Sequence, residues 1–162
     1  MPELTRTSWD EYFFNMAENV ASRSTCIRRS VGAVLVNTKH RVLGTGYNGP
    51  YSGYPHCTKD TCIRTKLNIP SGSEPHLCVA VHAEMNIIHM LKDTEIEGGT
   101  LYCTTQPCCT CLKSFLSCGI YRIVWKDKYN DTVSDILMST YGDVAPLQVG
   151  DYSLWQMTKH SE

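Results

Sequence analysis

The sequence lacks any apolar run of the roughly 18 residues that a membrane-spanning helix needs. Residues 1–10 show no signal-peptide pattern, so we expect a cytoplasmic protein without a membrane partner. A surplus of positive charge is also lacking, because 15 Lys and Arg against 16 Asp and Glu give a formal net charge of −1. No basic field is therefore available to attract a long nucleic acid. A small phosphorylated substrate would need only a few local Arg or Lys residues.

Cysteine, in contrast, is abundant, with nine in 162 residues. In a reducing compartment such cysteines are more often metal ligands than disulfide partners. His82 is followed two positions later by Glu84, and Cys108 and Cys111 stand three apart behind Pro107. Imidazole nitrogen and thiolate sulfur suit Zn²⁺, and three protein ligands leave one position open for water. His-x-Glu with Pro-Cys-x-x-Cys is the known signature of zinc-dependent deaminases.

Hydrophobic periodicity predicts helices alternating with strands. The expected helices cover residues 8–23, 79–92, 108–118 and 132–141, and the expected strands cover 31–36, 41–47, 100–104, 120–125 and 144–149. This order predicts one α/β domain over residues 1–162, a three-layer α/β/α sandwich with a mixed sheet of about five strands. The strands at 100–104 and 120–125 should be parallel, because a right-handed strand-helix-strand unit connects them. Residues 49–78 form a long excursion, which is unusual in a compact domain unless something ties it down.

The two motifs fall at the beginnings of two expected helices. Residues three apart share one helix face, so the sulfurs of Cys108 and Cys111 can bind one ion. A helix N-terminus also favours thiolate over thiol. Glu84 should stay outside the zinc shell and carry protons in a hydrolytic deamination. The alternative is a closed zinc site with a fourth ligand, in which Glu84 would have no role.

Beyond these motifs, the sequence resembles the deoxycytidylate deaminase family of the cytidine-deaminase-like superfamily, over roughly residues 9–129. The segments that carry the resemblance are 24–26 (Ser-Thr-Cys), 31–34 (Val-Gly-Ala-Val), 46–50 (Gly-Tyr-Asn-Gly-Pro), 82–86 (His-Ala-Glu-Met-Asn) and 127–129 (Asp-Lys-Tyr). The resemblance implies conversion of dCMP to dUMP and ammonia, which supplies thymidylate synthesis. It also implies a homohexamer that dCTP activates and dTTP inhibits together with Mg²⁺.

The resemblance also implies roles for single residues. It places catalytic zinc on His82, Cys108 and Cys111, with Glu84 as the proton carrier. Substrate contacts would come from Asn48 to the deoxyribose, from Ala83, and from Tyr129 beside the base. Arg28, Arg29 and Lys128 are candidates for the phosphate or an effector. For Asn48 the alternative is a bare Asn-Gly turn, and for Tyr129 it is an ordinary tyrosine at a strand end. The basic residues could instead be solvated surface charges.

The excursion resembles that of family members with a second, structural zinc. Its expected ligands are Cys26, Cys57, Cys62 and Cys78, with His76 as the competing fourth ligand. Four ligands would close the shell, so this zinc would fold the segment and perform no chemistry. The alternative is a set of unrelated free thiols.

Competing functions remain open at this stage. A mononucleotide deaminase is the leading hypothesis, and dCTP or a cytosine nucleoside is an alternative substrate. A deaminase acting on cytosine or adenine in a polynucleotide would need a stripe of basic residues and aromatic side chains on which bases stack. The net charge of −1 argues against this function. A non-catalytic zinc module is the third hypothesis, and it would tolerate the loss of Glu84.

Overall fold

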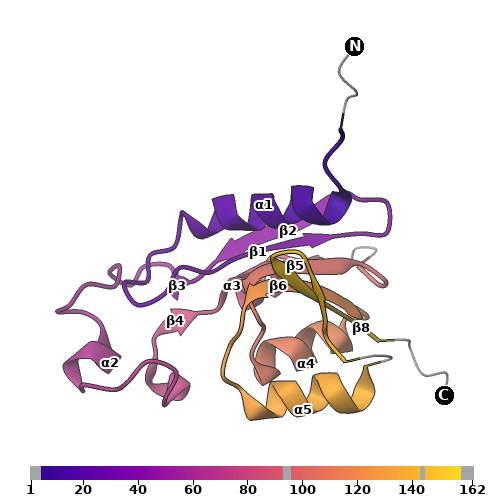
Figure 1. The fold of residues 1–162 in the computed structure, drawn as a ribbon. Coiled ribbons are helices and arrows are strands. Elements are labelled where there is room, and N and C mark those ends of the chain that lie inside the picture. Colours follow the sequence, from indigo (N-terminus) through magenta and orange to yellow (C-terminus); the bar gives the residue numbers. More distant parts are fainter. Residues whose placement is uncertain (1–4, 93–95, 143–144, 158–162) are drawn as a thin grey trace.

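The computed structural model describes residues 5–92, 96–142 and 145–157. Six strands form one mixed sheet in the order β2-β1-β5-β6-β8-β7 (Figure 1). The strands of this sheet are β1 (Gly32–Val36), β2 (Val42–Tyr47), β5 (Thr100–Thr105), β6 (Arg122–Asp127), β7 (Leu147–Val149) and β8 (Tyr152–Gln156). The helices are α1 (Trp9–Ala21), α2 (Ile63–Lys66), α3 (Ala83–Ile88), α4 (Cys109–Ser117) and α5 (Thr132–Tyr141). β5 and β6 are parallel, as predicted, and the α/β class with a mixed sheet is confirmed.

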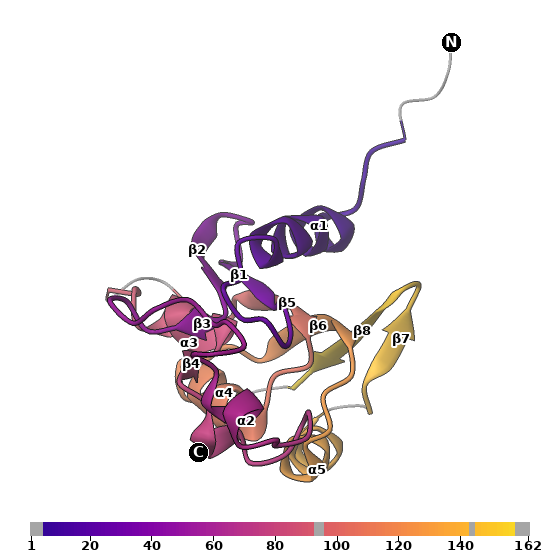
Figure 2. The same cartoon turned by 90° about the vertical axis from the view of Figure 1, so that its left-hand side faces the viewer.

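Helices cover both faces of the sheet, with α1 on one face and α4 and α5 on the other (Figures 1 and 2). The core beneath α1 comprises Phe13, Phe14, Ala17, Val34, Val36, Tyr102 and Val124. The strand residues of the opposite core are Ala33, Leu35, Leu101, Cys103, Ile123, Trp125 and Trp155. Successive strand residues point to opposite faces, and both faces are covered. This is why β1 reads as an unbroken apolar run rather than an alternating one.

The expected first helix is confirmed with its cap. The Ser8 side chain accepts a hydrogen bond from the backbone N–H of Glu11 at 3.2 Å, as an N-cap residue should. The helix lies very close to β1, because a Cβ added at Gly32 would stand 2.2 Å from the Ala17 carbonyl oxygen. Only glycine permits this approach of helix to strand.

The helix predicted at 79–92 begins later and ends earlier than expected. Ala80–Val81 forms a short strand, β4, which pairs with β3 (Gly49–Pro50) in a separate two-stranded sheet. The ladder with β3 takes the backbone groups that a helix would have used, so α3 starts only after His82. Leu91 lies beyond the end of α3 and still packs against the core.

The C-terminal part of the sheet also differs from the prediction. Of the strand expected at 144–149, residue 144 lies outside the described residues, and β7 spans Leu147–Val149. β8 was not predicted, and it inserts between β6 and β7. Trp155 on β8 is fully buried and donates its indole N–H to the Met138 carbonyl on α5 at 2.7 Å. The sheet therefore has six strands rather than about five.

The excursion lies at one end of the sheet, beside β3 and β4 (Figure 1). It contains α2 and a 3₁₀ turn at Pro75–Leu77. The backbone N–H of Cys57 donates to the Thr25 carbonyl at 3.1 Å, and the Arg28 guanidinium donates to the Ile69 carbonyl at 2.8 Å. These bonds fasten the segment to the connection between α1 and β1. Within the described ranges, no helix is long and apolar enough to cross a membrane.

Candidate metal and active site

Two helix N-termini meet at the predicted metal site. His82 is the N-cap residue of α3, Cys108 is the N-cap residue of α4, and Cys111 lies in the first turn of α4. The His82 Nδ1 atom is 3.5 Å from each of the two sulfurs. In the part of the chain that the structure describes, this is the one set of three possible donor atoms that lie within 4.8 Å of one another.

The donor set fits zinc in its chemistry. One imidazole nitrogen and two sulfurs are ligands that Zn²⁺ prefers, and three ligands leave the fourth position open. A hydrogen bond from the Cys111 thiol, helped by His82, lowers the pKa of Cys108 to about 4 despite its burial. One sulfur is thus held as a thiolate, ready to bind a cation. These three residues would hold the metal.

Glu84 lies beside the donor set in the first turn of α3, with 4% of its surface exposed. Burial raises the pKa of Glu84 to about 7, although the neighbouring His82 opposes the shift. The Cys103 side chain on β5 also hydrogen-bonds the Glu84 carboxyl group. A carboxyl group that titrates near neutral pH can both accept and release a proton, which a proton carrier must do.

A cavity of about 310 Å³ opens onto this set. It brings together most of the residues predicted from the sequence, and Arg64 and Gln106 in addition. The lining includes Cys26, Arg28, Arg29, Asn48, Cys57, Cys62, Cys78, His82, Ala83, Glu84, Cys108, Lys128 and Tyr129. His76 is exposed and is not among the residues that line the cavity.

Asn48 is buried, and its side chain is largely used within the protein. Its Oδ1 accepts from the Ser24 hydroxyl at 2.6 Å and from the Val31 backbone N–H at 2.9 Å. Its Nδ2 donates to the Arg29 carbonyl at 2.8 Å, which leaves one amide hydrogen for a ligand. The asparagine therefore ties β2 to the connection before β1, whether or not it binds a substrate.

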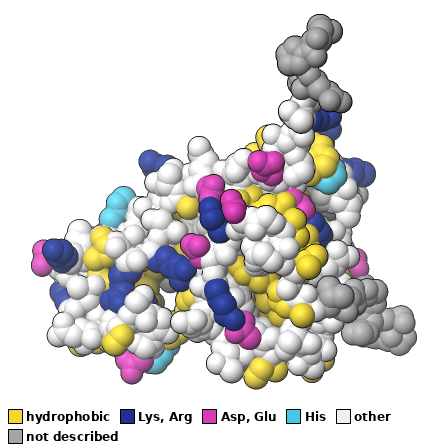
Figure 3. All heavy atoms as spheres, in the orientation of Figure 1, with side chains coloured by type: hydrophobic (Ala, Val, Ile, Leu, Met, Phe, Trp, Pro, Cys, Tyr) yellow, Lys and Arg dark blue, Asp and Glu magenta, His cyan; other side chains and the backbone are white. Residues whose placement is uncertain are grey.

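Four basic side chains line the cavity, and among the described residues Glu84 is the only acidic one in the lining. The Arg64 guanidinium donates to the carbonyls of Pro70 and Ser73 at 3.0 and 2.7 Å, and its Nε is buried without a partner. Lys128 forms an ion pair of 3.1 Å with Asp135. Lys and Arg side chains gather over the excursion on the left of Figure 3. Sequence reasoning missed Arg64, although it stands only two residues after Cys62.

The four cysteines of the proposed second site face the same cavity. Burial, together with the nearby Cys26, Cys62 and Cys78, raises the pKa of the Cys57 thiol to about 11. Among these described cysteines, no three sulfurs approach one another as closely as the donor atoms of the His82 set. The second zinc therefore stays a prediction.

The sheet order and the flanking helices are those of the cytidine-deaminase-like fold, and the paired helix N-termini form its candidate zinc site. The chain belongs to the family described as the cytidine and deoxycytidylate deaminase zinc-binding region, whose sequence model matches residues 7–126. The deoxycytidylate deaminase of Mycobacterium phage D29 is 40% identical over 127 residues, which cover 75% of this chain and 97% of the phage protein.

Two fungal relatives are considerably longer. The deoxycytidylate deaminases of Schizosaccharomyces pombe and Saccharomyces cerevisiae are each 38% identical over 130 residues, or 80% of this chain. The chain spans only about 40% of their length. Among solved structures, the dCMP deaminase of cyanophage S-TIM5 in complex with dCMP and dUMP superposes with a TM-score of 0.64 and 26% identity. That match covers 80% of this chain and 89% of the phage chain.

Proposed function

We propose that this chain catalyses the zinc-dependent hydrolytic deamination of dCMP to dUMP and ammonia. The observation that carries the proposal is one cavity lined by His82 and Cys108 of the zinc donor set, by the buried Glu84 and by four basic side chains. The third donor, Cys111, is buried beside His82 and Cys108. The names of the D29 relative and of the S-TIM5 structure support the same substrate. The second zinc is part of the proposal, supported by the four cysteines that face the cavity.

The reaction adds water across the C4–N3 bond of the cytosine ring and then expels the 4-amino group. Zinc bound by the donor set would lower the pKa of water toward neutrality. The Glu84 carboxylate accepts a proton from the attacking water and delivers it to N3. The same carboxylate then takes the proton of the new C4 hydroxyl and passes it to the 4-amino group. The C4–N4 bond breaks, ammonia leaves and the C4 carbonyl of dUMP remains.

The remaining cavity residues bind the nucleotide. Arg28, Arg29 and Lys128 offer cations to the 5′-phosphate, and the structure adds Arg64 to these candidates. The backbone at Ala83 and the Tyr129 ring contact the base. The free amide hydrogen of Asn48 contacts the deoxyribose.

Several further properties rest on the family resemblance alone. They are activation by dCTP, inhibition by dTTP with Mg²⁺, a homohexamer and the supply of dUMP for thymidylate synthesis. The cytoplasmic location, expected from the sequence, also stays a proposal. The alternative substrates are dCTP, a cytosine nucleoside and, less favoured by the net charge of −1, a polynucleotide.

Ammonia release tests the substrate directly. The protein with zinc bound is given dCMP, deoxycytidine, CMP, dCTP and a cytosine-containing oligonucleotide in parallel. We expect the highest kcat/KM with dCMP. It should exceed deoxycytidine because only the nucleotide has a charged phosphate for the basic side chains, and it should exceed CMP, dCTP and the oligonucleotide if the relatives' substrate is also that of this chain. Activity confined to the oligonucleotide would exclude a mononucleotide deaminase, and a preference for deoxycytidine would exclude the phosphate contacts.

Substitution Glu84→Gln separates proton transfer from metal binding. The variant should retain zinc, since Glu84 is not a ligand, and should lose about 10²–10⁴-fold in kcat. Metal analysis and ammonia release measure the two properties, and Glu11→Gln on the exposed side of α1 is the control. An active Glu84→Gln enzyme would show that another group carries the proton.

A further inference from the structure

Cys108 is both the N-cap residue of α4 and a proposed metal ligand. An N-cap side chain normally accepts a hydrogen bond from the backbone N–H two or three residues ahead. The Cys108 sulfur forms no cap hydrogen bond of normal geometry, although it interacts with the Cys111 backbone N–H. It also lies 3.5 Å from His82 Nδ1 in the metal site. The first turn of a helix has free N–H groups that need partners, and the Cys109 N–H must find one elsewhere.

Asp131 supplies that cap from another element. Its Oδ2 accepts from the Cys109 backbone N–H at 2.7 Å, at the first residue of α4. Its Oδ1 accepts from the backbone N–H groups of Val133 and Ser134 at 3.0 and 3.1 Å, so it is also the N-cap of α5. One carboxylate thus accepts hydrogen bonds from the free N–H groups at the beginnings of two helices.

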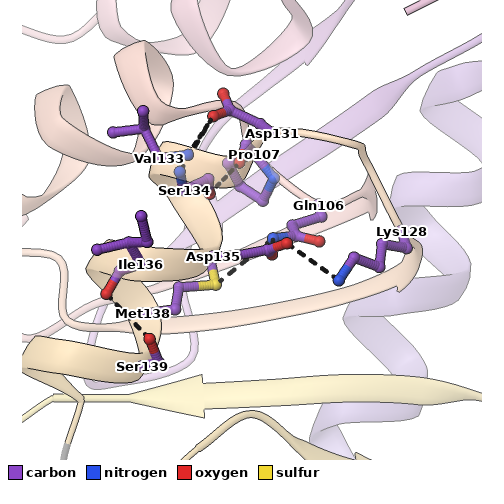
Figure 4. Close-up of polar contacts among 10 residues, drawn as sticks. All are labelled: Gln106, Pro107, Lys128, Asp131, Val133, Ser134, Asp135, Ile136, Met138 and Ser139. Carbon is purple, nitrogen blue, oxygen red and sulfur yellow. Dashed lines mark hydrogen bonds and ion pairs between the residues drawn. The ribbon is translucent and has the colours of Figure 1, made fainter.

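The first turn of α5 holds the rest of the same segment (Figure 4). The buried Ser134 hydroxyl donates to the Pro107 carbonyl at 2.9 Å. The Gln106 amide donates to Asp135 Oδ1 at 2.8 Å, and Lys128 pairs with the other oxygen of that carboxylate. Gln106, Pro107 and Cys109, the residues on either side of Cys108, are therefore each hydrogen-bonded to the N-terminal end of α5 or to its cap. These anchors lie beyond residue 126, where the family match ends.

We propose that Asp131 is a positioning residue for the metal site. By accepting the Cys109 N–H, its carboxylate fixes the backbone at Cys108, and with it the direction of the Cys108 sulfur toward His82. Groups that orient metal ligands in this way typically contribute a factor of about 10–100 to metal affinity. The inference rests on the metal site of the proposed function, but not on its substrate.

Two substitutions separate this role from the capping of α5. In Asp131→Asn the carbonyl oxygen can keep the two bonds to Val133 and Ser134, while the amide group faces the Cys109 N–H with no acceptor. In Asp131→Ser the shorter side chain still caps α5 well but does not reach α4. The control is Ser8→Ala, which removes the cap of α1 on the opposite face of the sheet.

The experiment measures metal binding rather than turnover. Each purified chain competes for Zn²⁺ with a chromophoric chelator, and the Co²⁺-substituted protein is examined for its thiolate-to-metal absorption band. Both Asp131 variants should bind zinc about 10–100-fold more weakly than the unaltered chain, with an altered cobalt spectrum. Ser8→Ala should lower stability and leave both metal readouts unchanged.

Three results would contradict these claims, two of them the positioning role and one the proposed function. Zinc affinity within twofold of the unaltered chain in both Asp131 variants would overturn the positioning role. An equal loss of affinity in Ser8→Ala would overturn it too, because metal binding would then follow global stability. If the unaltered chain bound no zinc through His82, Cys108 and Cys111, the proposed function itself would fail.

Discussion

At the scale of single residues, Asp10 connects α1 to the sheet through charge. The Arg122 guanidinium donates to both carboxylate oxygens at 2.9 and 2.7 Å, and the Tyr102 hydroxyl donates at 2.6 Å. Burial raises the pKa of Asp10, but the bonds from Arg122 and Tyr102 outweigh it and leave the pKa below the ordinary value of 3.8. The ionised carboxylate is therefore more favourable in the folded chain than in the unfolded one.

Asp10→Asn should lower the free energy of unfolding by about 1–2 kcal/mol at pH 7, since the pair is partly exposed and water screens it. The effect of pH on this stabilisation follows from the difference between the folded and unfolded pKa of Asp10. The contribution of Asp10 is present above pH 3.8 and is lost as the pH falls through its lower folded pKa. Urea unfolding at several pH values should therefore show the two proteins converging only in acid.

The exposed ion pair between Lys126 and Glu18 is the matched control for this prediction. Glu18→Gln removes it, and we expect no measurable change in stability. A constant difference between Asp10→Asn and the unaltered chain down to the lowest pH would show that packing, and not charge, makes the contribution.

The sequence identifies site residues where the chemistry constrains their spacing. His82, Cys108 and Cys111 are recognisable because a zinc ion requires nitrogen and sulfur donors, and the two cysteines have the spacing of one helix face. Glu84 is recognisable because it stands two residues after His82. Arg64 and Asp131 carry no such signal. Each acts through backbone groups distant in sequence or through a cavity formed by several elements, and only the folded chain brings these together.

At the scale of elements, β2 and α3 meet at Gly46. A Cβ added there would stand 2.2 Å from the carbonyl oxygen of Ala83, which belongs to the turn that holds His82 and Glu84. Gly46→Ala should lower the free energy of unfolding by about 3 kcal/mol, because backbone must move to admit the methyl group. Zinc affinity should fall as well, since the displaced backbone lies between His82 and Glu84. Chemical denaturation and zinc competition measure the two effects.

Gly44 on the same strand is the matched control. Its added Cβ would meet two side-chain methyl groups and no backbone atom, Ile87 Cγ2 at 3.2 Å and Leu91 Cδ2 at 4.0 Å. Gly44→Ala should therefore stay within about 1 kcal/mol of the unaltered chain. Equal effects at the two glycines would mean that the strand, rather than its contact with α3, is sensitive.

Elements with a strong apolar pattern of their own were predicted well. The short strands whose position is set by a partner strand were not. α1, β1, β5 and β6 each have an apolar pattern that matches the face they bury. Ala80 and Val81 fit the helical pattern of α3 as well as they fit a strand. They form a strand because they pair with β3. β8 has a similar origin, because a position between β6 and β7 is set by the sheet and not by its five residues.

At the scale of the whole molecule, basic groups and cysteines concentrate at one end. The net charge is −1, yet the excursion and its neighbours bring Arg28, Arg29, Arg64 and Lys128 to the cavity. Helix and strand content within the excursion is small, comprising α2 and one 3₁₀ turn. Its buried Cys57 and Cys62 add few apolar contacts for a segment of that length. A structural metal would cross-link the segment and so supply the stability that its few apolar contacts do not.

We therefore expect two zinc ions per chain and a different role for each. Cys57→Ser should remove one ion, because Cys57 is the cysteine that interacts with the other three. The zinc at His82 should remain, and limited proteolysis should cut residues 51–79 faster while the sheet stays intact. Cys118→Ser, at the end of α4, is the control and should keep both ions and the original cleavage rate. Metal analysis and mass spectrometry of the fragments read out both effects. One zinc per unaltered chain, or unchanged cleavage in Cys57→Ser, would show that hydrogen bonds such as Arg28 to Ile69 hold the excursion without a metal.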